Sequence, residues 1–147
     1  MEHTGLLYSE FITQYNFELK KYLTSSGMPF NQAKALMLIG VFGEEDLSQK
    51  ELAELCGIDT PAMSRVIDKL SKEGYIIREK QTVDSRRVNL ELTDKGREKS
   101  SAIIDMYNDY NAEFLLPLSK AERRQLSEIL SKITHKSELV RRLKSKK

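Results

Sequence analysis

Cysteine and histidine are scarce in this chain, with one Cys and two His among 147 residues. A single thiol, Cys56, excludes an intrachain disulfide and is typical of a protein kept in a reducing compartment. The histidines, His3 and His135, each stand alone, so no zinc cluster with ordinary ligand spacing is expected. The longest apolar run, 35–43, is far below the ~20 residues that span a bilayer. Residues 1–30 lack the basic start and apolar run of a secretory signal, so we expect a cytoplasmic protein with no membrane association.

The motifs of enzyme chemistry are also missing. Gly40 and Gly43 do not have the spacing of a glycine-rich phosphate loop. No Ser/His/Asp or Cys/His set can be assembled, and no motif supports a pair of catalytic carboxylates. The acidic run 44–46 has no histidine nearby and is interpreted as a solvated loop rather than a metal site. We therefore expect no enzymatic activity and no cofactor.

Charge is distributed unevenly along the chain, although 24 Lys and Arg nearly balance 22 Asp and Glu to give a net charge of +2. Residues 1–59 hold 4 of the basic and 9 of the acidic side chains, whereas residues 60–147 hold 20 and 13. A basic half favours a polyanionic partner, but a solvated helix face would have the same composition. The position of the charges along the predicted elements therefore has to distinguish a polyanion-binding surface from a solvated helix face.

Apolar residues at helical spacing, together with caps and stops, predict six helices. The first covers 6–23, and the second begins at an Asn31 cap and stops at Gly43. The remaining helices are predicted to begin at Ser48, Thr60, Thr93 and Ser119, and the first three of these to stop at Gly57, Gly74 and Pro117. Ser48 and Ser119 each open a capping box, because a glutamate follows three residues later.

Between the fourth and fifth helices the pattern changes to the alternation of strands. Segments 75–78 and 88–93 are predicted to pair across a charged loop, 80–87. The predicted fold is therefore mainly α with a small β-hairpin. The outer helices have longer apolar faces than the compact middle can cover, so a second copy of the chain is the simplest partner.

The third and fourth helices have the spacing of a helix-turn-helix, whose second helix is presented outward. Ala53 is small enough for close helix approach, and Gly57 permits the sharp turn. Arg65 suits a bidentate contact with guanine, while Lys69 and Lys72 can reach phosphates. The residues expected to contact DNA here are Thr60, Pro61, Ala62, Ser64, Arg65 and Lys69. An ordinary exposed helix face is the alternative.

The hairpin loop carries further candidate DNA contacts, which are Asp84, Arg86 and Arg87. An arginine on a narrow hairpin fits a minor groove, where negative potential is concentrated. Asp84 stands two residues before Arg86 and is placed to brace its guanidinium. A solvated loop is the alternative for both arginines, and Lys95 and Arg97 are left open between phosphate contact and simple exposure.

Four blocks in this order and spacing resemble the MarR family of winged helix-turn-helix regulators over nearly the whole chain: Glu51-Leu52-Ala53, then Ser64-Arg65-Val66-Ile67-Asp68-Lys69-Leu70 with Gly74-Tyr75-Ile76, then Asp84-Ser85-Arg86-Arg87, then Leu92-Thr93-Asp94-Lys95-Gly96. The resemblance implies a homodimer built from the N- and C-terminal helices, with a winged helix-turn-helix in each subunit. It implies binding of double-stranded DNA at a pseudo-palindromic operator, with Arg86 in the minor groove and Asp84 orienting it. The chain departs from the family pattern in the segment before the second helix, which is Pro29-Phe30-Asn31 here.

We therefore expect an N-terminal dimerisation helix in 1–30, a winged helix-turn-helix DNA-binding domain in 31–96 and C-terminal dimerisation helices in 97–147. The expected function is that of a sequence-specific transcription regulator, acting as a repressor, whose two recognition helices lie about one helical turn of DNA apart, ~34 Å. A winged helix used only for protein–protein assembly is the alternative, which the basic hairpin loop disfavours.

Aromatic and methionine side chains are candidates to line an effector pocket, although such stripes more often belong to a core. The family resemblance implies a small aromatic effector. The candidates are Phe11, Tyr15, Met28, Phe30, Met37, Met106, Tyr107 and Tyr110. Some members of the family sense oxidants through a cysteine in the first helix, which has none here. For Cys56 a buried packing role is favoured over a sensing role.

Overall fold

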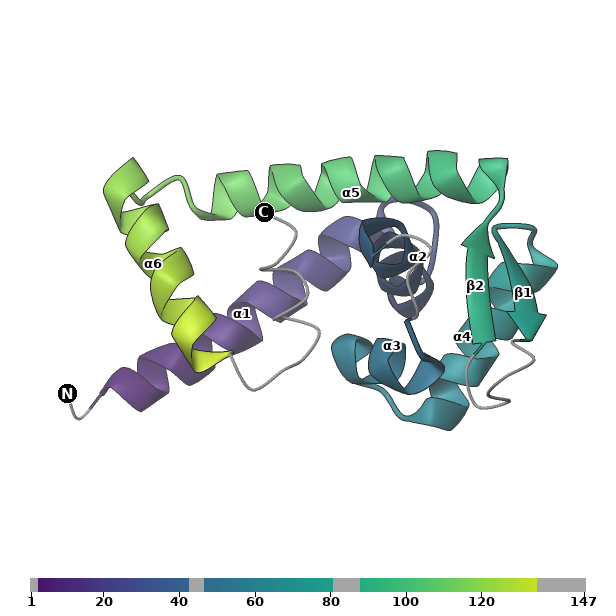
Figure 1. Cartoon of the computed structure of the whole chain (residues 1–147). Coiled ribbons are helices and arrows are strands. Elements are labelled where there is room, and N and C mark those ends of the chain that lie inside the picture. Colours follow the sequence, from purple (N-terminus) through teal and green to yellow (C-terminus); the bar gives the residue numbers. More distant parts are fainter. Residues whose placement is uncertain (1–2, 43–46, 81–87, 135–147) are drawn as a thin grey trace. The chain divides into compact units, whose positions relative to one another are not determined.

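The computed structural model describes residues 3–42, 47–80 and 88–134 (Figure 1). Within these ranges the elements follow the order α1 (Thr4–Thr24), α2 (Phe30–Phe42), α3 (Gln49–Cys56), α4 (Thr60–Lys72), β1 (Ile76–Lys80), β2 (Val88–Leu92), α5 (Asp94–Phe114) and α6 (Lys120–Ile133). This order confirms the predicted fold, which is mainly α with one small hairpin. The chain divides into two compact units, Met1–Tyr110 and Asn111–Lys147.

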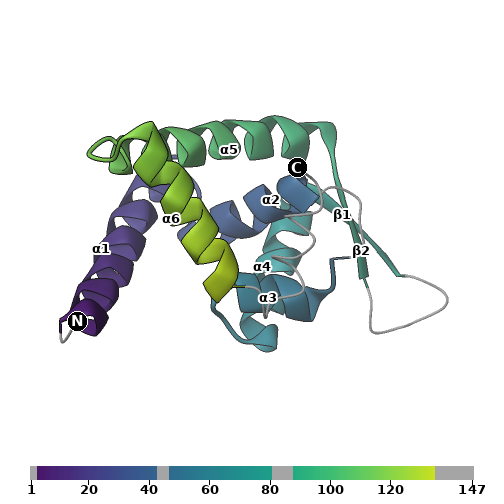
Figure 2. The same ribbon diagram turned by 60° about the vertical axis from the view of Figure 1, so that its left-hand side comes forward.

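The core of the first unit lies where α2, α3 and α4 pack together, as the views in Figures 1 and 2 agree. Each of these helices contributes apolar side chains that solvent does not reach, and α5 adds one more. They include Leu36, Phe42, Leu52, Met63, Ile67, Leu70 and Ile103. Burying one such side chain contributes ~1.5–3 kcal/mol, so this cluster holds the three helices in a fixed arrangement.

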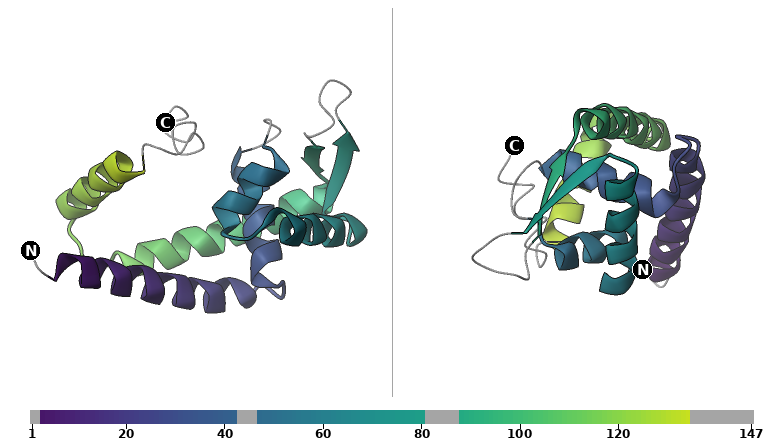
Figure 3. Two further views of the ribbon diagram at one scale, coloured as in Figure 1. Left: turned by 90° about the horizontal axis from the view of Figure 1, so that it is seen from below. Right: turned by 90° about the vertical axis from the view of Figure 1, so that its right-hand side faces the viewer.

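The hairpin is a two-stranded antiparallel sheet in which Ile76 pairs with Leu92 and Arg78 with Leu90. Ile76 and Leu90 are buried, whereas Ile77, the next residue along β1, is 48% exposed. Alternate residues of a strand point to opposite faces, so the hairpin covers the core with one face and turns the other to solvent. Figure 3 shows the two strands side by side, with β2 continuing into α5.

Several predicted boundaries are wrong by one to three residues, among them the start of the second helix and the end of the fifth. Asn31 is not the cap of α2, because the Pro29 carbonyl already accepts the Ala33 N–H at 2.9 Å and the helix begins at Phe30. The fifth helix does not reach Pro117 but ends at Phe114. Proline disfavours helical backbone in the residue before it, so the chain leaves the helix earlier and forms a turn.

The first strand begins one residue later than predicted, at Ile76. Tyr75 belongs instead to the end of α4, since its N–H donates to the Leu70 carbonyl and the Gly74 N–H donates to Ser71. These two bonds, with Gly74 at a φ of +81°, form a Schellman motif. The predicted stop at Gly74 is confirmed, and the motif directs the chain into the hairpin.

Helices α2 and α5 approach closely at Gly40. A Cβ at this position would collide with the Ser100 hydroxyl. The Ser100 Oγ donates to the Leu36 carbonyl at 3.1 Å, so it is held in place. This contact fixes the first half of α5 against the core of the first unit.

The second unit contains the end of α5, a turn and α6. Ser119 forms the predicted capping box with Glu122, and the Arg123 Nε donates to the Leu115 and Leu118 carbonyls at 3.1 Å. None of the α6 side chains is buried, and Ile129 and Ile133 are more than half exposed. The last predicted helical residues, 135–143, lie outside the described ranges. No helix in the described part of the chain is both long and apolar enough to cross a membrane.

Candidate nucleic-acid interface

Helices α3 and α4 form a helix-turn-helix whose caps set the turn between them. The Ser48 side chain accepts the Glu51 N–H at 3.1 Å, which confirms the predicted capping box. Gly57 ends α3 in the left-handed region, at a φ of +68°, where a side chain would be strained. The Asp59 carboxylate then caps α4 by accepting the Ala62 N–H at 2.7 Å. The turn therefore presents the start of α4 in one defined direction.

The outer face of α4 carries the candidate DNA contacts. Met63, Ile67 and Leu70 are fully buried on the opposite face. Four of the six predicted contact residues are exposed and two are half-buried; the exposed ones are Thr60, Pro61, Arg65 and Lys69, and the half-buried ones are Ala62 and Ser64. The structure brings these residues together along one helix, on the side away from the core.

The hairpin is joined to α4 by an ion pair between Arg78 of β1 and Asp68 of α4. The Arg78 Nη2 lies 2.8 Å from the Asp68 Oδ1, and the two side chains are 32% and 50% exposed. The predicted loop contacts, Asp84, Arg86 and Arg87, lie outside the described residues. The two strands that flank that loop are part of the described structure, and β1 is fixed to α4, the candidate recognition helix.

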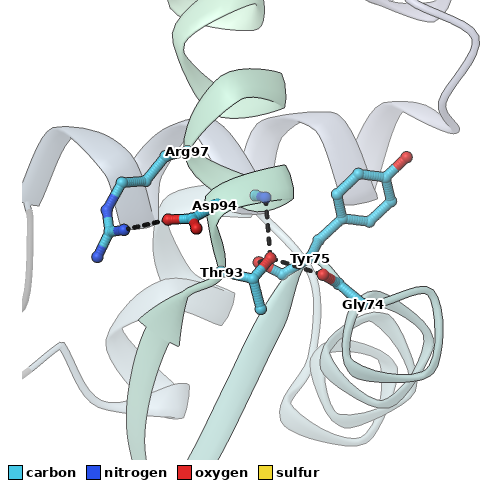
Figure 4. Close-up of polar contacts among 6 residues, drawn as sticks. Gly74, Tyr75, Thr93, Asp94 and Arg97 are labelled. Atoms are coloured by element: carbon cyan, nitrogen blue, oxygen red, sulfur yellow. Dashed lines mark hydrogen bonds and ion pairs between the residues drawn. The ribbon is translucent and has the colours of Figure 1, made fainter.

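A second junction joins the hairpin and α4 to the start of α5, as Figure 4 shows. The Thr93 hydroxyl lies 2.6 Å from the Gly74 carbonyl and accepts the Gly96 N–H at 3.0 Å. The Thr93 N–H also donates to the Tyr75 carbonyl at 3.1 Å. A Cβ on Gly96 would collide with that same carbonyl, so glycine is required for this close approach. Thr93 therefore caps α5, as predicted, and also ties it to the end of α4.

Lys95 and Arg97 make local contacts in the structure. The Lys95 Nζ donates to the Glu73 carbonyl at 2.7 Å and lies 4.4 Å from the centre of the Tyr75 ring. Arg97 pairs with Asp94 at 3.1 Å on the exposed first turn of α5 (Figure 4). Both cations are thus placed at the junction just described, and the choice between phosphate contact and simple exposure stays open for both.

Part of the predicted effector set meets between α1 and α5. Phe11 stacks with Tyr15 at 5.9 Å between ring centres, and the Tyr15 and Tyr107 hydroxyls are 3.5 Å apart. The Tyr110 hydroxyl donates to the Tyr15 carbonyl at 2.9 Å. Burial, and secondly the negative charge of Glu18, raises the pKa of Tyr110, so this phenol keeps its proton near neutral pH.

The remaining members of the predicted effector set lie elsewhere in the packing. Met28 and Met37 are each 4% exposed and belong to the core of the first unit. Phe30 is half-buried at the start of α2, with the Lys34 Nζ 5.7 Å from its ring centre. The cluster of Phe11, Tyr15, Tyr107 and Tyr110, hereafter the aromatic cluster, is therefore the part of the set that the contacts bring together.

Cys56 is buried at the end of α3, as predicted. Burial raises the pKa of its thiol to about 11, and the nearby Lys34 opposes this only in part. A thiol with such a pKa is almost wholly protonated at neutral pH and reacts slowly. Among the described residues, no group of three or more His, Cys, Asp and Glu side chains is placed to hold a metal ion.

Two of the interface contacts were not predicted from the sequence. Asp59 precedes Pro61 by two residues and had the signal of an N-cap, an acidic residue just before a helix start. Arg78 had a weaker signal, since the alternation of β1 places it on the same face as buried Ile76. Its partner Asp68 could not be identified, because a contact between a helix and a strand has no sequence spacing of its own.

The comparisons with known proteins fit this geometry. The MarR family model matches residues 26–87. A probable transcriptional regulator from Pseudomonas aeruginosa is 26% identical, with a TM-score of 0.66 over 85% of this chain and 95% of that one. MepR of Staphylococcus aureus, in a complex with DNA, is 20% identical, with a TM-score of 0.70 over 89% and 95%. A MarR family protein of Mycobacterium tuberculosis in complex with salicylic acid is 22% identical, with a TM-score of 0.71 over 88% and 95%.

A helix-turn-helix followed by a β-hairpin wing defines a winged helix-turn-helix protein. The resemblance to the MarR family noted in the sequence is supported by the family model over residues 26–87, and the structural neighbours have the same fold. Residues 26–87 of this chain match the MarR family model, and the chain has the winged helix-turn-helix fold of the solved MarR-family structures.

Proposed function

We propose that the protein binds double-stranded DNA as a homodimer and represses transcription from a pseudo-palindromic operator. The observation that carries this proposal is the outer face of α4, which presents Arg65 and Lys69 beside a hairpin fixed to the same helix. In such a module the helix enters the major groove and the hairpin reaches the adjacent minor groove. The proposed contacts are Thr60, Pro61, Ala62, Ser64, Arg65, Lys69, Asp84, Arg86 and Arg87.

Homodimerisation is proposed for the segments outside residues 31–96, namely 1–30 and 97–147. The first half of α1 exposes a row of large apolar side chains, with Leu6 and Leu7 each about 70% exposed. On α6, Ile129 and Ile133 are also more than half exposed. Surfaces of this kind are typical of protein–protein contacts, and a second copy of the chain would cover them and place two α4 helices on one DNA face.

A small aromatic effector is proposed to act at the aromatic cluster. Its phenol groups and stacked rings offer the combination of apolar surface and few polar groups that suits such a ligand. The complex of the M. tuberculosis relative with salicylic acid supports this ligand class. The effector would act by changing the separation of the two α4 helices, and a coupling of ~1–3 kcal/mol is enough for a switch.

The decisive experiment is selection of bound sequences from a random duplex pool, followed by affinity measurements on the selected duplex. We expect enrichment of an inverted repeat and an affinity that falls steeply as salt rises, because phosphate contacts release counterions. Arg86→Ala is expected to weaken binding more than tenfold while the dimer persists in sedimentation. Arg124→Ala on exposed α6 is the matched control, because it removes the same charge outside the proposed DNA contacts, and its affinity per dimer is expected to equal that of the natural sequence.

The alternative is a winged helix that serves protein–protein assembly alone. Such a protein would not be retained on heparin or duplex DNA at physiological salt, and the selection would enrich no sequence. Full affinity of the Arg86→Ala variant would contradict the proposed role of the wing arginine. A flat salt dependence would contradict the phosphate contacts.

A further inference from the structure

An acidic side chain stands among the basic residues of the proposed DNA-reading face. Asp68 comes three residues after Arg65 and directly before Lys69, and its side chain is half exposed. A carboxylate on a surface that meets phosphates is repelled by them unless a cation compensates its charge. The structure supplies that cation from another element, through the 2.8 Å contact with Arg78.

The position of Arg78 follows from the pleat of the hairpin. It lies two residues after Ile76, which is 2% exposed, and pairs with Leu90, which is 8% exposed. Residues at this spacing share one face of a strand, so Arg78 starts from the buried face and its guanidinium reaches the middle of α4. Its direction is therefore set by the sheet register and does not depend on DNA.

We infer that Arg78 is a positioning residue for DNA binding, which acts by neutralising and holding the Asp68 carboxylate. With the pair intact, Arg65 and Lys69 can meet the duplex without an uncompensated negative charge beside them. With Arg78 removed, Asp68 would repel the phosphates and draw the neighbouring cations towards itself. This inference rests on the proposed function of α4 and adds a role that the exposed contacts alone do not reveal.

Direct contact of Arg78 with a phosphate is the competing explanation. A guanidinium paired with a carboxylate at 2.8 Å holds a charge-assisted hydrogen bond, and moving to a phosphate would leave Asp68 uncompensated. The geometry therefore favours action through Asp68. The two explanations differ in one measurable respect: only action through Asp68 allows a second substitution at that position to restore binding.

The test compares Arg78→Gln, Asp68→Asn and the double variant on the selected duplex. Arg78→Gln is expected to weaken binding roughly fivefold, the scale of one partly exposed ion pair. Asp68→Asn is expected to bind at least as tightly as the natural sequence, and the double variant within about twofold of it. The matched control is Asp105→Asn on exposed α5, which removes the same charge and is expected not to rescue Arg78→Gln.

The salt dependence of binding separates this role from direct contact. If Arg78→Gln lowers the slope of log affinity against log salt by about one charge, and Asp68→Asn restores nothing, Arg78 contacts a phosphate and the inference is wrong. Arg78→Lys keeps the cation and is expected to bind better than Arg78→Gln; equal weakness of the two would also overturn it. Failure of the natural protein to bind any duplex would instead refute the proposed function.

Discussion

Gly96 allows the sharpest stability prediction, because a side chain there meets main chain and not a movable side chain. A Cβ at Gly96 would overlap the Tyr75 carbonyl oxygen, which accepts the Thr93 N–H. Overpacking of this kind destabilises by ~1–3 kcal/mol. Weakening the Thr93 bond adds about 1 kcal/mol, and the higher helix propensity of alanine offsets ~0.5–1 kcal/mol.

Gly96→Ala is therefore expected to lower the free energy of unfolding by ~1–3 kcal/mol, and the melting temperature by roughly 3–9 °C for a chain of this size. Thermal unfolding followed by circular dichroism measures this, at one fixed protein concentration because a dimer melts in a concentration-dependent way. Gly5→Ala in α1 is the matched control, since nothing lies within 4 Å of the added Cβ, and its melting temperature should stay or rise. A Gly96→Ala variant that melts at or above the natural protein would refute the reasoning.

Two further predictions concern the caps and the thiol. Ser48→Ala should destabilise by about 1 kcal/mol and weaken DNA binding, whereas Ser119→Ala, the same change at the start of α6, should destabilise similarly and leave the affinity per dimer unchanged. With a pKa of about 11, Cys56 should react with a thiol reagent at pH 8 about a hundredfold more slowly in the folded than in the unfolded chain. Below pH 9 this thiol is protonated in both states; between pH 9 and about 11 only the unfolded chain ionises, so stability measured by denaturant should fall across that window.

Local signals in the sequence predicted the framework of the interface well. Capping boxes at Ser48 and Ser119, the glycine stops at Gly57 and Gly74, and the Thr93 cap are each set by residues a few positions apart, so they can be read without a tertiary structure. The order of the elements followed from these signals. The sequence could not locate the first residue of α2 or the last residue of α5, because Pro29 and Pro117 act on backbone geometry beyond their own positions.

The contacts between elements were harder to predict. Gly96 was recognised only as part of a sequence block, and nothing local indicates that a side chain there would meet the carbonyl of Tyr75, which is 21 positions earlier in the chain. The effector set was predicted as one group from its residue types, but side chains of the same type divide between the core, as Met28 and Met37 do, and the aromatic cluster. The type of a residue thus predicts whether its side chain is buried, but it does not predict which side chains it contacts.

The hairpin is held to α4 through both of its strands, and by different physics at each. The first strand is held by a charged pair, Arg78 with Asp68, at the middle of the helix. The second is held at its exit by Thr93, whose backbone and hydroxyl bond to the end of the same helix. Salt screens a partly exposed ion pair but scarcely affects the backbone bond. Raising the salt concentration should therefore weaken the first attachment while the second and the buried side chains Ile76 and Leu90 keep the hairpin in place, so the charge of Asp68 becomes less fully compensated without any loss of the fold.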